Sequence, residues 1–156
     1  MKPYDLEYLR KAIEVATNAR LHGNHPFGAV LVDSQGKMIM EGENTVITGR
    51  DYTAHAETNL VRKAGAAFTA KELSGCTLYA STEPCAMCSG AIFWAGISRV
   101  VFGLSEVGLL ELVAHLPAGN FLNLPCREVL ARGDHTVEVV GPLLEDEARI
   151  PHLGFW

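Results

Sequence analysis

The spacing of apolar and polar residues divides the chain into alternating helices and strands. In the first segment apolar residues recur every three or four positions, which is typical of a helix that buries one face: Leu6, Leu9, Ile13 and Ala16. Asp5 stands where it would cap this helix, which we expect to end near residues 22–24. Two short apolar runs follow at 27–32 and 38–40, and the turn residues between them predict a β-hairpin.

The rest of the chain alternates between helical and extended patterns. We expect further helices over 54–66, 85–95, 106–115 and 143–150. Short apolar runs predict strands over 77–80, 100–103 and 137–140, with an irregular stretch rich in Pro, Gly and Asn before the last one. Strands joined through helices favour parallel neighbours, whereas the hairpin is antiparallel. The pattern therefore predicts an α/β fold, a three-layer α/β/α sandwich around a five-stranded mixed sheet, in a single domain over 1–156.

Composition and charge narrow the class of protein. Hydrophobic residues make up 48% of the chain and charged residues 20%, which is typical of a globular protein. No apolar run reaches the roughly 18 to 20 residues that a membrane-spanning helix needs, and charges interrupt the N-terminal segment where a signal peptide would be apolar. We expect a cytoplasmic protein. The net charge of −5 argues against a large nucleic-acid footprint, which depends on clustered Lys and Arg.

Two short motifs carry the candidate chemistry, and both lie where a helix is expected to begin. His55 and Glu57 form the first, and Pro84, Cys85 and Cys88 form the second. Cysteines three residues apart lie on one face of a helix, and the positive end of the helix favours the thiolates that a metal requires. Two thiolates and one imidazole suit Zn²⁺ and leave its fourth position open for water. Glu57 is placed to accept the proton of that water and pass it on.

Each of these residues has a simpler interpretation when it is taken alone. His55 could be a buried histidine, Glu57 a solvated helix carboxylate, and the cysteine pair a redox pair or half of a structural zinc site. A structural zinc site would show further ligands at suitable spacing, and Cys76 and Cys126 lack that pattern. The combination therefore favours a catalytic zinc ion.

The order H-x-E followed by P-C-x-x-C is the signature of zinc nucleobase deaminases. With residues 26–29 and Asn44, the sequence resembles the cytidine deaminase superfamily over nearly its whole length. The resemblance implies a zinc cofactor, hydrolytic removal of ammonia from a heterocyclic base, and a homodimer. It also implies that Asn44 binds the base, that Phe27 packs on its face, and that the backbones near Ala56 and Pro84 bind ring or reacting atoms. The alternatives are core packing for Phe27 and a turn for Asn44.

Two branches of that superfamily are close: guanine and related small-molecule base deaminases, and the bacterial deaminase of the tRNA wobble adenosine. Residues 26–29 and 90–95 look more like the guanine deaminases, and the excess of acidic residues agrees. We expect a purine base or nucleoside of the guanine type as substrate, with no nucleic-acid or membrane partner. The tRNA wobble adenosine and cytosine or cytidine are alternative substrates, and a non-catalytic zinc-stabilised binding module is an alternative of another class. From Val107 onward the sequence departs from both branches.

The C-terminal residues 151–156 end in Phe155 and Trp156, two large aromatic side chains that are costly to leave in water. In guanine deaminases the C-terminal segment closes over the active site, sometimes that of a partner subunit. The resemblance therefore implies that Trp156 contacts the substrate. Sealing a subunit interface or the core is the alternative.

Overall fold

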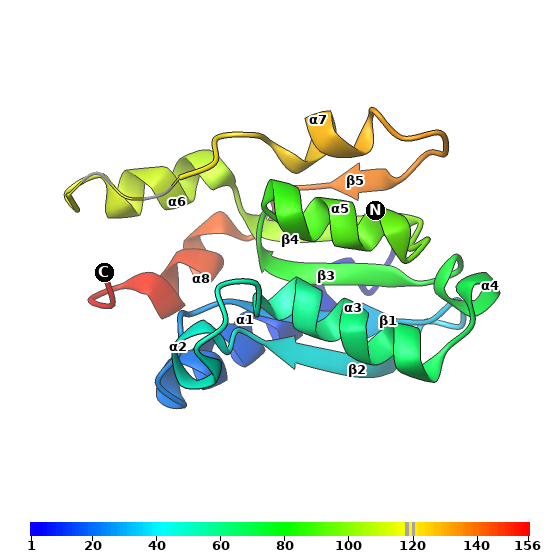
Figure 1. Ribbon diagram of the computed structural model, residues 1–156, viewed down its shortest axis with the longest axis horizontal. Coiled ribbons are helices and arrows are strands. Elements are labelled where there is room, and N and C mark those ends of the chain that lie inside the picture. The colour runs from blue at the N-terminus through cyan, green and yellow to red at the C-terminus, as the bar shows by residue number, and fades with distance from the viewer. Residues whose placement is uncertain (118, 120) are drawn as a thin grey trace.

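A five-stranded sheet runs through the molecule, and the computed structural model describes residues 1–117, 119 and 121–156 (Figure 1). Its strands are β1 (Gly28–Val32), β2 (Met38–Glu43), β3 (Thr77–Thr82), β4 (Arg99–Leu104) and β5 (Glu138–Val140). They lie in the order β2-β1-β3-β4-β5. β1 pairs antiparallel with both β2 and β3, whereas β3, β4 and β5 are parallel to one another. The predicted mixed sheet is confirmed.

Helices cover both faces of this sheet. One face carries α1 (Asp5–Leu21) and α8 (Glu145–Arg149), and the other carries α3 (Ala56–Ala67), α5 (Ala86–Trp94) and α7 (Cys126–Leu130) (Figure 1). The remaining helices are α2 (Val46–Gly49), α4 (Ala70–Leu73), α6 (Glu106–Val113) and the 3-10 helix Ile150–His152. The three-layer α/β/α arrangement is thus as predicted. Among the described residues, no helix is both long and apolar enough to cross a membrane.

The interior strand β1 is an uninterrupted apolar run. All five residues are buried, because the strand is covered on both faces. Successive side chains point to opposite faces. Ala29 and Leu31 belong to the core beneath α3 and α5, and Val30 and Val32 belong to the core beneath α1.

One predicted residue role was wrong, and three short helices were not predicted. Asp5 does not cap α1: Tyr4 occupies the cap position, and the Asp5 carboxylate is buried against the Arg99 guanidinium, with Nη1 to Oδ1 at 2.8 Å. The short helices α2, α4 and α7 were not predicted, because four or five residues are too few to show a helical period. Residues 118 and 120 of the stretch expected to be irregular lie outside the described residues.

The two motif helices begin one or two residues later than expected. His55 and Cys85 keep an extended backbone, with ψ of 159° and 171°, and serve as the N-cap residues of α3 and α5. Both side chains therefore stand just ahead of a helix N-terminus. This places them at the same end of the sheet, where α3 and α5 begin.

Candidate metal centre and active site

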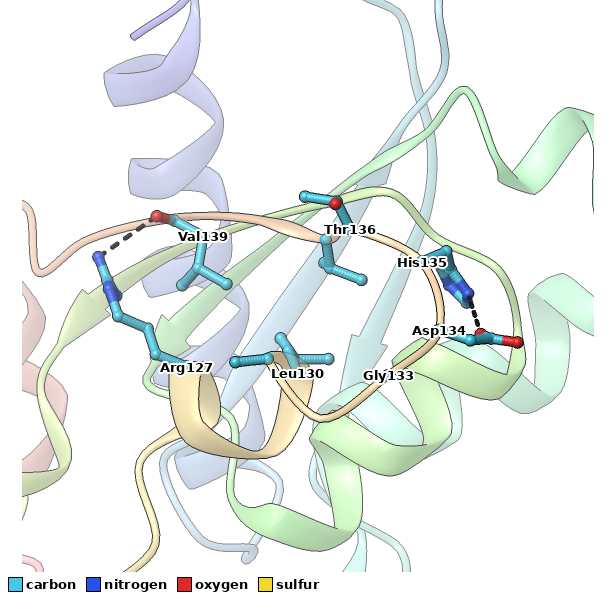
Figure 2. A pocket seen from close by; sticks show the side chains of 9 residues that line it. Arg127, Leu130, Gly133, Asp134, His135, Thr136 and Val139 are labelled. Carbon is cyan, nitrogen blue, oxygen red and sulfur yellow. Dashed lines mark hydrogen bonds and ion pairs between the residues drawn. The ribbon is translucent and has the colours of Figure 1, made fainter.

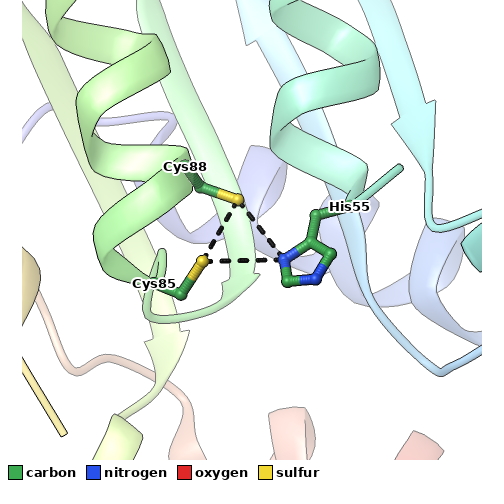
Figure 3. A group of neighbouring side chains, drawn as sticks. All are labelled: His55, Cys85 and Cys88. Atoms are coloured by element: carbon green, nitrogen blue, oxygen red, sulfur yellow. Dashed lines mark hydrogen bonds between the residues drawn. The ribbon is translucent and has the colours of Figure 1, made fainter. Parts of the chain in front are cut away.

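Three side chains from the two motifs meet at the starts of α3 and α5. The Cys85 and Cys88 Sγ atoms are 3.5 Å apart, and the His55 Nδ1 atom lies 3.6 Å from Cys85 Sγ and 3.5 Å from Cys88 Sγ (Figure 3). Ligand atoms of this kind around one tetrahedral zinc ion stand roughly 3.5–3.8 Å apart. The three atoms therefore have the donor chemistry and the spacing to hold a zinc ion.

The local fold explains why the cysteines are suited to a metal. Cys88 is fully buried in the first turn of α5, and Cys85 precedes it as the N-cap residue. Hydrogen bonding with Cys88 and then with His55 outweighs burial and lowers the pKa of the Cys85 thiol to about 4. The group is therefore ready to bind as a thiolate at neutral pH.

Glu57 lies beside this trio, on the first turn of α3. Its side chain is buried, with 5% exposed, and its Oε2 atom accepts the thiol hydrogen of Cys88 at 3.4 Å. Burial, and then the negative charge of Cys85, raise the pKa of this carboxyl to about 7. A carboxyl group with a pKa near neutrality can both accept and return a proton.

A cavity of about 380 Å³ opens over these side chains. Its floor holds two of the three candidate zinc ligands, His55 and Cys85, together with Glu57. Two further glutamates, Glu83 and Glu106, also line the cavity. The other lining residues are mostly apolar or aromatic: Phe27, Tyr52, Thr82, Met87, Leu109, Leu110, Phe121, Leu122 and Trp156. Among the described lining residues none is Lys or Arg.

Comparison with known proteins agrees with this geometry. A family model of the cytidine and deoxycytidylate deaminase zinc-binding region matches residues 3–104. The chain belongs to this deaminase family. It is therefore a member of a family of zinc-binding hydrolytic enzymes, and the predicted resemblance, enzyme class and cofactor are confirmed.

Three relatives of this deaminase carry different descriptions. A protein of Schizosaccharomyces pombe described as a probable cytosine deaminase is 51% identical over 155 residues, covering 97% of this chain and 92% of the relative. The tRNA-specific adenosine deaminase of Haemophilus influenzae is 43% identical over 146 residues, covering 92% of this chain and 78% of the relative. The structure of a guanine deaminase from Nitrosomonas europaea superposes with a TM-score of 0.74 at 27% identity, covering 92% of this chain and 80% of that one.

Of the other predicted site residues, some line the cavity and others are buried away from it. Phe27 and Trp156 line the cavity, with ring centroids 6.2 Å apart and planes inclined at 52°. Asn44 is buried at the end of β2, and its Oδ1 atom accepts the backbone N–H of Val46 at 3.1 Å, as in an Asx turn.

Ala56 and Pro84 are buried in the two helix starts. Ala56 is the first residue of α3, directly between His55 and Glu57. The Pro84 carbonyl accepts the Ser89 hydroxyl at 3.2 Å. Neither residue is among those that line the cavity.

Sequence reasoning did not identify three polar side chains at this site. Glu83 precedes Pro84 and could have been noticed from its place beside the motif. Glu106 and His152 reach the site only because α6 and the C-terminal residues fold over it, and no local pattern marks them. His152 is buried, and its ring nitrogens lie 3.1 Å from Trp156 Nε1 and 3.4 Å from Thr82 Oγ1.

A second hollow of about 410 Å³ lies between α7 and β5, away from the metal centre (Figure 2). Arg127 lies at its edge and donates through Nη2 to the carbonyls of Val139, at 3.3 Å, and Gly141, at 2.8 Å. His135 stacks on Phe93, with ring centroids 4.2 Å apart. The Arg127 contacts attach α7 to β5, the His135 stack attaches the loop before β5 to α5, and none of the metal-centre residues lines this hollow.

Proposed function

We propose that this deaminase converts a free heterocyclic base to its oxo form with release of ammonia, and that cytosine is the first candidate substrate. The observation that carries the proposal is the cavity: the Glu57 carboxyl group and the candidate zinc ligands His55 and Cys85 at the floor, an apolar and aromatic wall, and no Lys or Arg among the described lining residues. Such a cavity suits a small uncharged planar ring.

The segment that forms the outer wall supports cytosine. Residues after Leu104 supply much of that wall, and the family model ends at residue 104. The S. pombe relative matches over 155 residues, so its similarity extends through this wall. The H. influenzae tRNA deaminase also matches through this wall, but at 43% identity against 51%. Because substrate choice depends on the wall rather than on the metal ligands, the higher identity of the S. pombe relative favours cytosine.

The residues of the floor account for the hydrolysis. His55, Cys85 and Cys88 would hold the zinc ion, which would lower the pKa of a bound water toward neutrality and so supply the nucleophile. Glu57 accepts a proton from the attacking water and delivers it to the ring nitrogen next to the carbon that carries the amine. It then transfers the second proton of that water to the leaving nitrogen, so that cytosine and water give uracil and ammonia.

Glu106 favours a free base over a nucleoside. Both carboxylate oxygens of Glu83 are occupied, because they accept the backbone N–H groups of Glu106 and Cys126 at 3.0 Å each. The Glu106 carboxylate also lines the cavity; it receives a backbone hydrogen bond from Leu124, and its two oxygens leave capacity to accept a ring N–H. Cytosine has that N–H at N1, whereas cytidine carries its sugar there.

Guanine is the second candidate. The guanine deaminase structure from N. europaea superposes on 92% of this chain, and guanine is also a planar base with a ring N–H on the side away from its amine. A purine was our expectation from the sequence. The tRNA wobble adenosine is disfavoured, because a polyanion requires basic side chains around the site and the described cavity is lined by three glutamates. A homodimer stays a prediction.

A substrate panel tests the proposal. Zinc content and ammonia release are measured on cytosine, cytidine, guanine, guanosine, adenine, adenosine and a tRNA anticodon stem-loop. We expect the highest kcat/KM with cytosine. A higher kcat/KM with guanine would replace the first candidate by the second, turnover of the RNA alone would contradict the small-molecule assignment, and zinc without any turnover would favour a binding module.

A matched pair of glutamates tests the role of Glu57. Glu57→Gln keeps the shape of the side chain but removes its proton-transfer capacity, so we expect kcat to fall by roughly 10²–10⁴ while zinc is retained. Glu128→Gln changes an exposed glutamate on α7 and should leave kcat unchanged. Wild-type turnover by the zinc-loaded Glu57→Gln variant would rule out this role.

A further inference from the structure

His152 lies directly behind the cavity and touches three of its wall residues. It is 2% exposed, at the end of the 3-10 helix Ile150–His152. Its Nδ1 atom lies 3.1 Å from Trp156 Nε1, its Nε2 atom lies 3.4 Å from Thr82 Oγ1, and its ring meets Phe27 edge to face at a centroid distance of 5.2 Å. All three partners line the cavity, whereas His152 itself does not.

The hydrogen bonds determine which nitrogen of His152 carries the proton. An indole N–H can only donate, so Nδ1 must be the bare acceptor facing Trp156. Nε2 then carries the hydrogen and donates it to the Thr82 hydroxyl. Burial, and then the charge of Arg20, lower the pKa of His152 to about 4, so the ring is neutral at physiological pH.

The backbone around His152 is held by a different residue. Arg20 on α1 donates through Nη1 to the carbonyls of Pro151, at 2.8 Å, and Leu153, at 2.7 Å. Its guanidinium also lies over the Phe155 ring, 5.6 Å from the centroid. Attachment of the C-terminal residues to the fold is thus separate from the orientation of the Trp156 indole.

The two aromatic rings that His152 contacts form a corner of the cavity. Phe27 and Trp156 are 6.2 Å apart and inclined at 52°, so a planar base cannot lie sandwiched between them. A base bound in the cavity would instead pack against one face of this corner. The direction in which the indole faces therefore decides how much aromatic surface the base meets.

We propose that His152 is a positioning residue, whose neutral ring holds the Trp156 indole and the Thr82 hydroxyl in the orientation that binds the base. The inference rests on the proposed function of the same cavity. It assigns His152 no contact with the reacting atoms. Its effect falls on substrate binding, and so on KM, rather than on kcat.

Two near-isosteric variants separate the two nitrogens of His152. His152→Asn keeps an acceptor close to the position of Nδ1 and so retains the indole contact. His152→Gln keeps a polar group close to the position of Nε2 and loses the acceptor for the indole. We expect KM for cytosine to rise about 3- to 10-fold in His152→Gln, the change that loss of one buried hydrogen bond gives, with kcat changed less than about twofold. KM in His152→Asn should stay close to the wild-type value.

Fluorescence reports on the indole without any substrate. The chain has two tryptophans, and Trp94 is 86% exposed on α5, so Trp94→Phe leaves Trp156 as the reporter. In that background His152→Gln should shift the Trp156 emission to longer wavelength and increase its quenching by acrylamide, whereas His152→Asn should not. Circular dichroism confirms that both variants fold.

The two readouts distinguish failure of this inference from failure of the proposed function. If the wild-type protein deaminates cytosine, equal KM values and equal Trp156 emission in the Asn and Gln variants would overturn the role of His152. If the wild-type protein deaminates no base in the panel, the proposed function fails. The emission of Trp156 then still decides whether His152 orients the indole.

Discussion

Glu83 accepts the backbone N–H of Cys126 through its Oε1 atom, at 3.0 Å. Its Oε2 atom accepts the backbone N–H of Glu106 at the same distance. The loop that carries the metal ligand Cys85 is thereby attached to the first residues of α6 and α7. One carboxylate therefore links the loop of the metal centre to the starts of α6 and α7 through two charge-assisted hydrogen bonds.

Glu83→Gln is expected to weaken that attachment. The amide that replaces one oxygen faces a backbone N–H, so one hydrogen bond is lost and its donor is left without a partner. We expect a loss of about 2 kcal/mol in the free energy of unfolding and a several-fold rise in KM, with zinc retained. Urea unfolding and steady-state kinetics measure both, with the exposed Glu128→Gln as control. Unchanged stability in Glu83→Gln would show that the two contacts carry little energy.

The layered fold could be predicted because its signal is local. β1, β3 and β4 are covered on both faces and read as apolar runs, and the helices between them repeat with a helical period. α4 could have been predicted from its capping residues rather than from its period, because Thr69 and Glu72 form a capping box. α7 follows Pro125 and spans five residues, too few for its period to be recognised.

The candidate site could be predicted only in part, for a related reason. His55, Glu57, Cys85 and Cys88 were found because their spacing within each motif already expresses the chemistry. The sequence did not identify Glu106 and His152, since their roles arise from where α6 and the C-terminal residues pack. Asp5 illustrates the same limit, because its partner Arg99 lies on β4, far away in sequence.

Cys88→Ser is expected to remove the metal while leaving the fold. Serine is a poor zinc ligand, and a chain of 156 residues buries enough surface to fold without a metal. We expect about one zinc ion per chain in the purified wild type. The variant should contain far less zinc and should be inactive. Cys76→Ser is the matched control, because Cys76 is equally buried but donates to the Glu72 carbonyl instead. Equal zinc loss in both variants would contradict the assigned ligand set.

Gly42 sets the distance between β2 and the helix that follows His55. A Cβ atom at Gly42 would lie 2.5 Å from the Ala56 carbonyl oxygen and 2.8 Å from Leu60 Cβ, so α3 would have to move. Gly42→Ala should therefore cost about 1–3 kcal/mol of stability and weaken zinc binding through His55. Gly65→Ala is the control on the same helix, because nothing lies within 4 Å of its Cβ position. It should stabilise the helix slightly. Equal zinc affinity in both variants would show that His55 tolerates the displacement.

The buried pair of Asp5 and Arg99 makes a prediction about acid stability. The Asp5 carboxylate accepts hydrogen bonds from both Nη atoms of Arg99, at 2.8 Å each, and from the Tyr79 hydroxyl, at 2.7 Å. Burial alone would raise its pKa, but the hydrogen bonds from Arg99, the Lys2 backbone and Tyr79 outweigh it and lower the pKa to about 2. Asp5→Asn leaves the buried Arg99 guanidinium without its buried carboxylate partner, which we expect to cost about 3 kcal/mol at pH 7.

The pH dependence identifies the source of that loss. Because the pKa of Asp5 is lower in the folded protein than its usual value of 3.8, its charge stabilises the fold fully above about pH 5 and progressively less as the pH falls toward 2. The difference in unfolding free energy between wild type and Asp5→Asn should therefore shrink between pH 5 and pH 2, as measured by urea unfolding at each pH. Asp134→Asn, at a carboxylate that is 92% exposed, should show only a small difference throughout. A difference for Asp5→Asn that stays constant down to pH 2 would mean that shape and packing at this position matter, and not the charge.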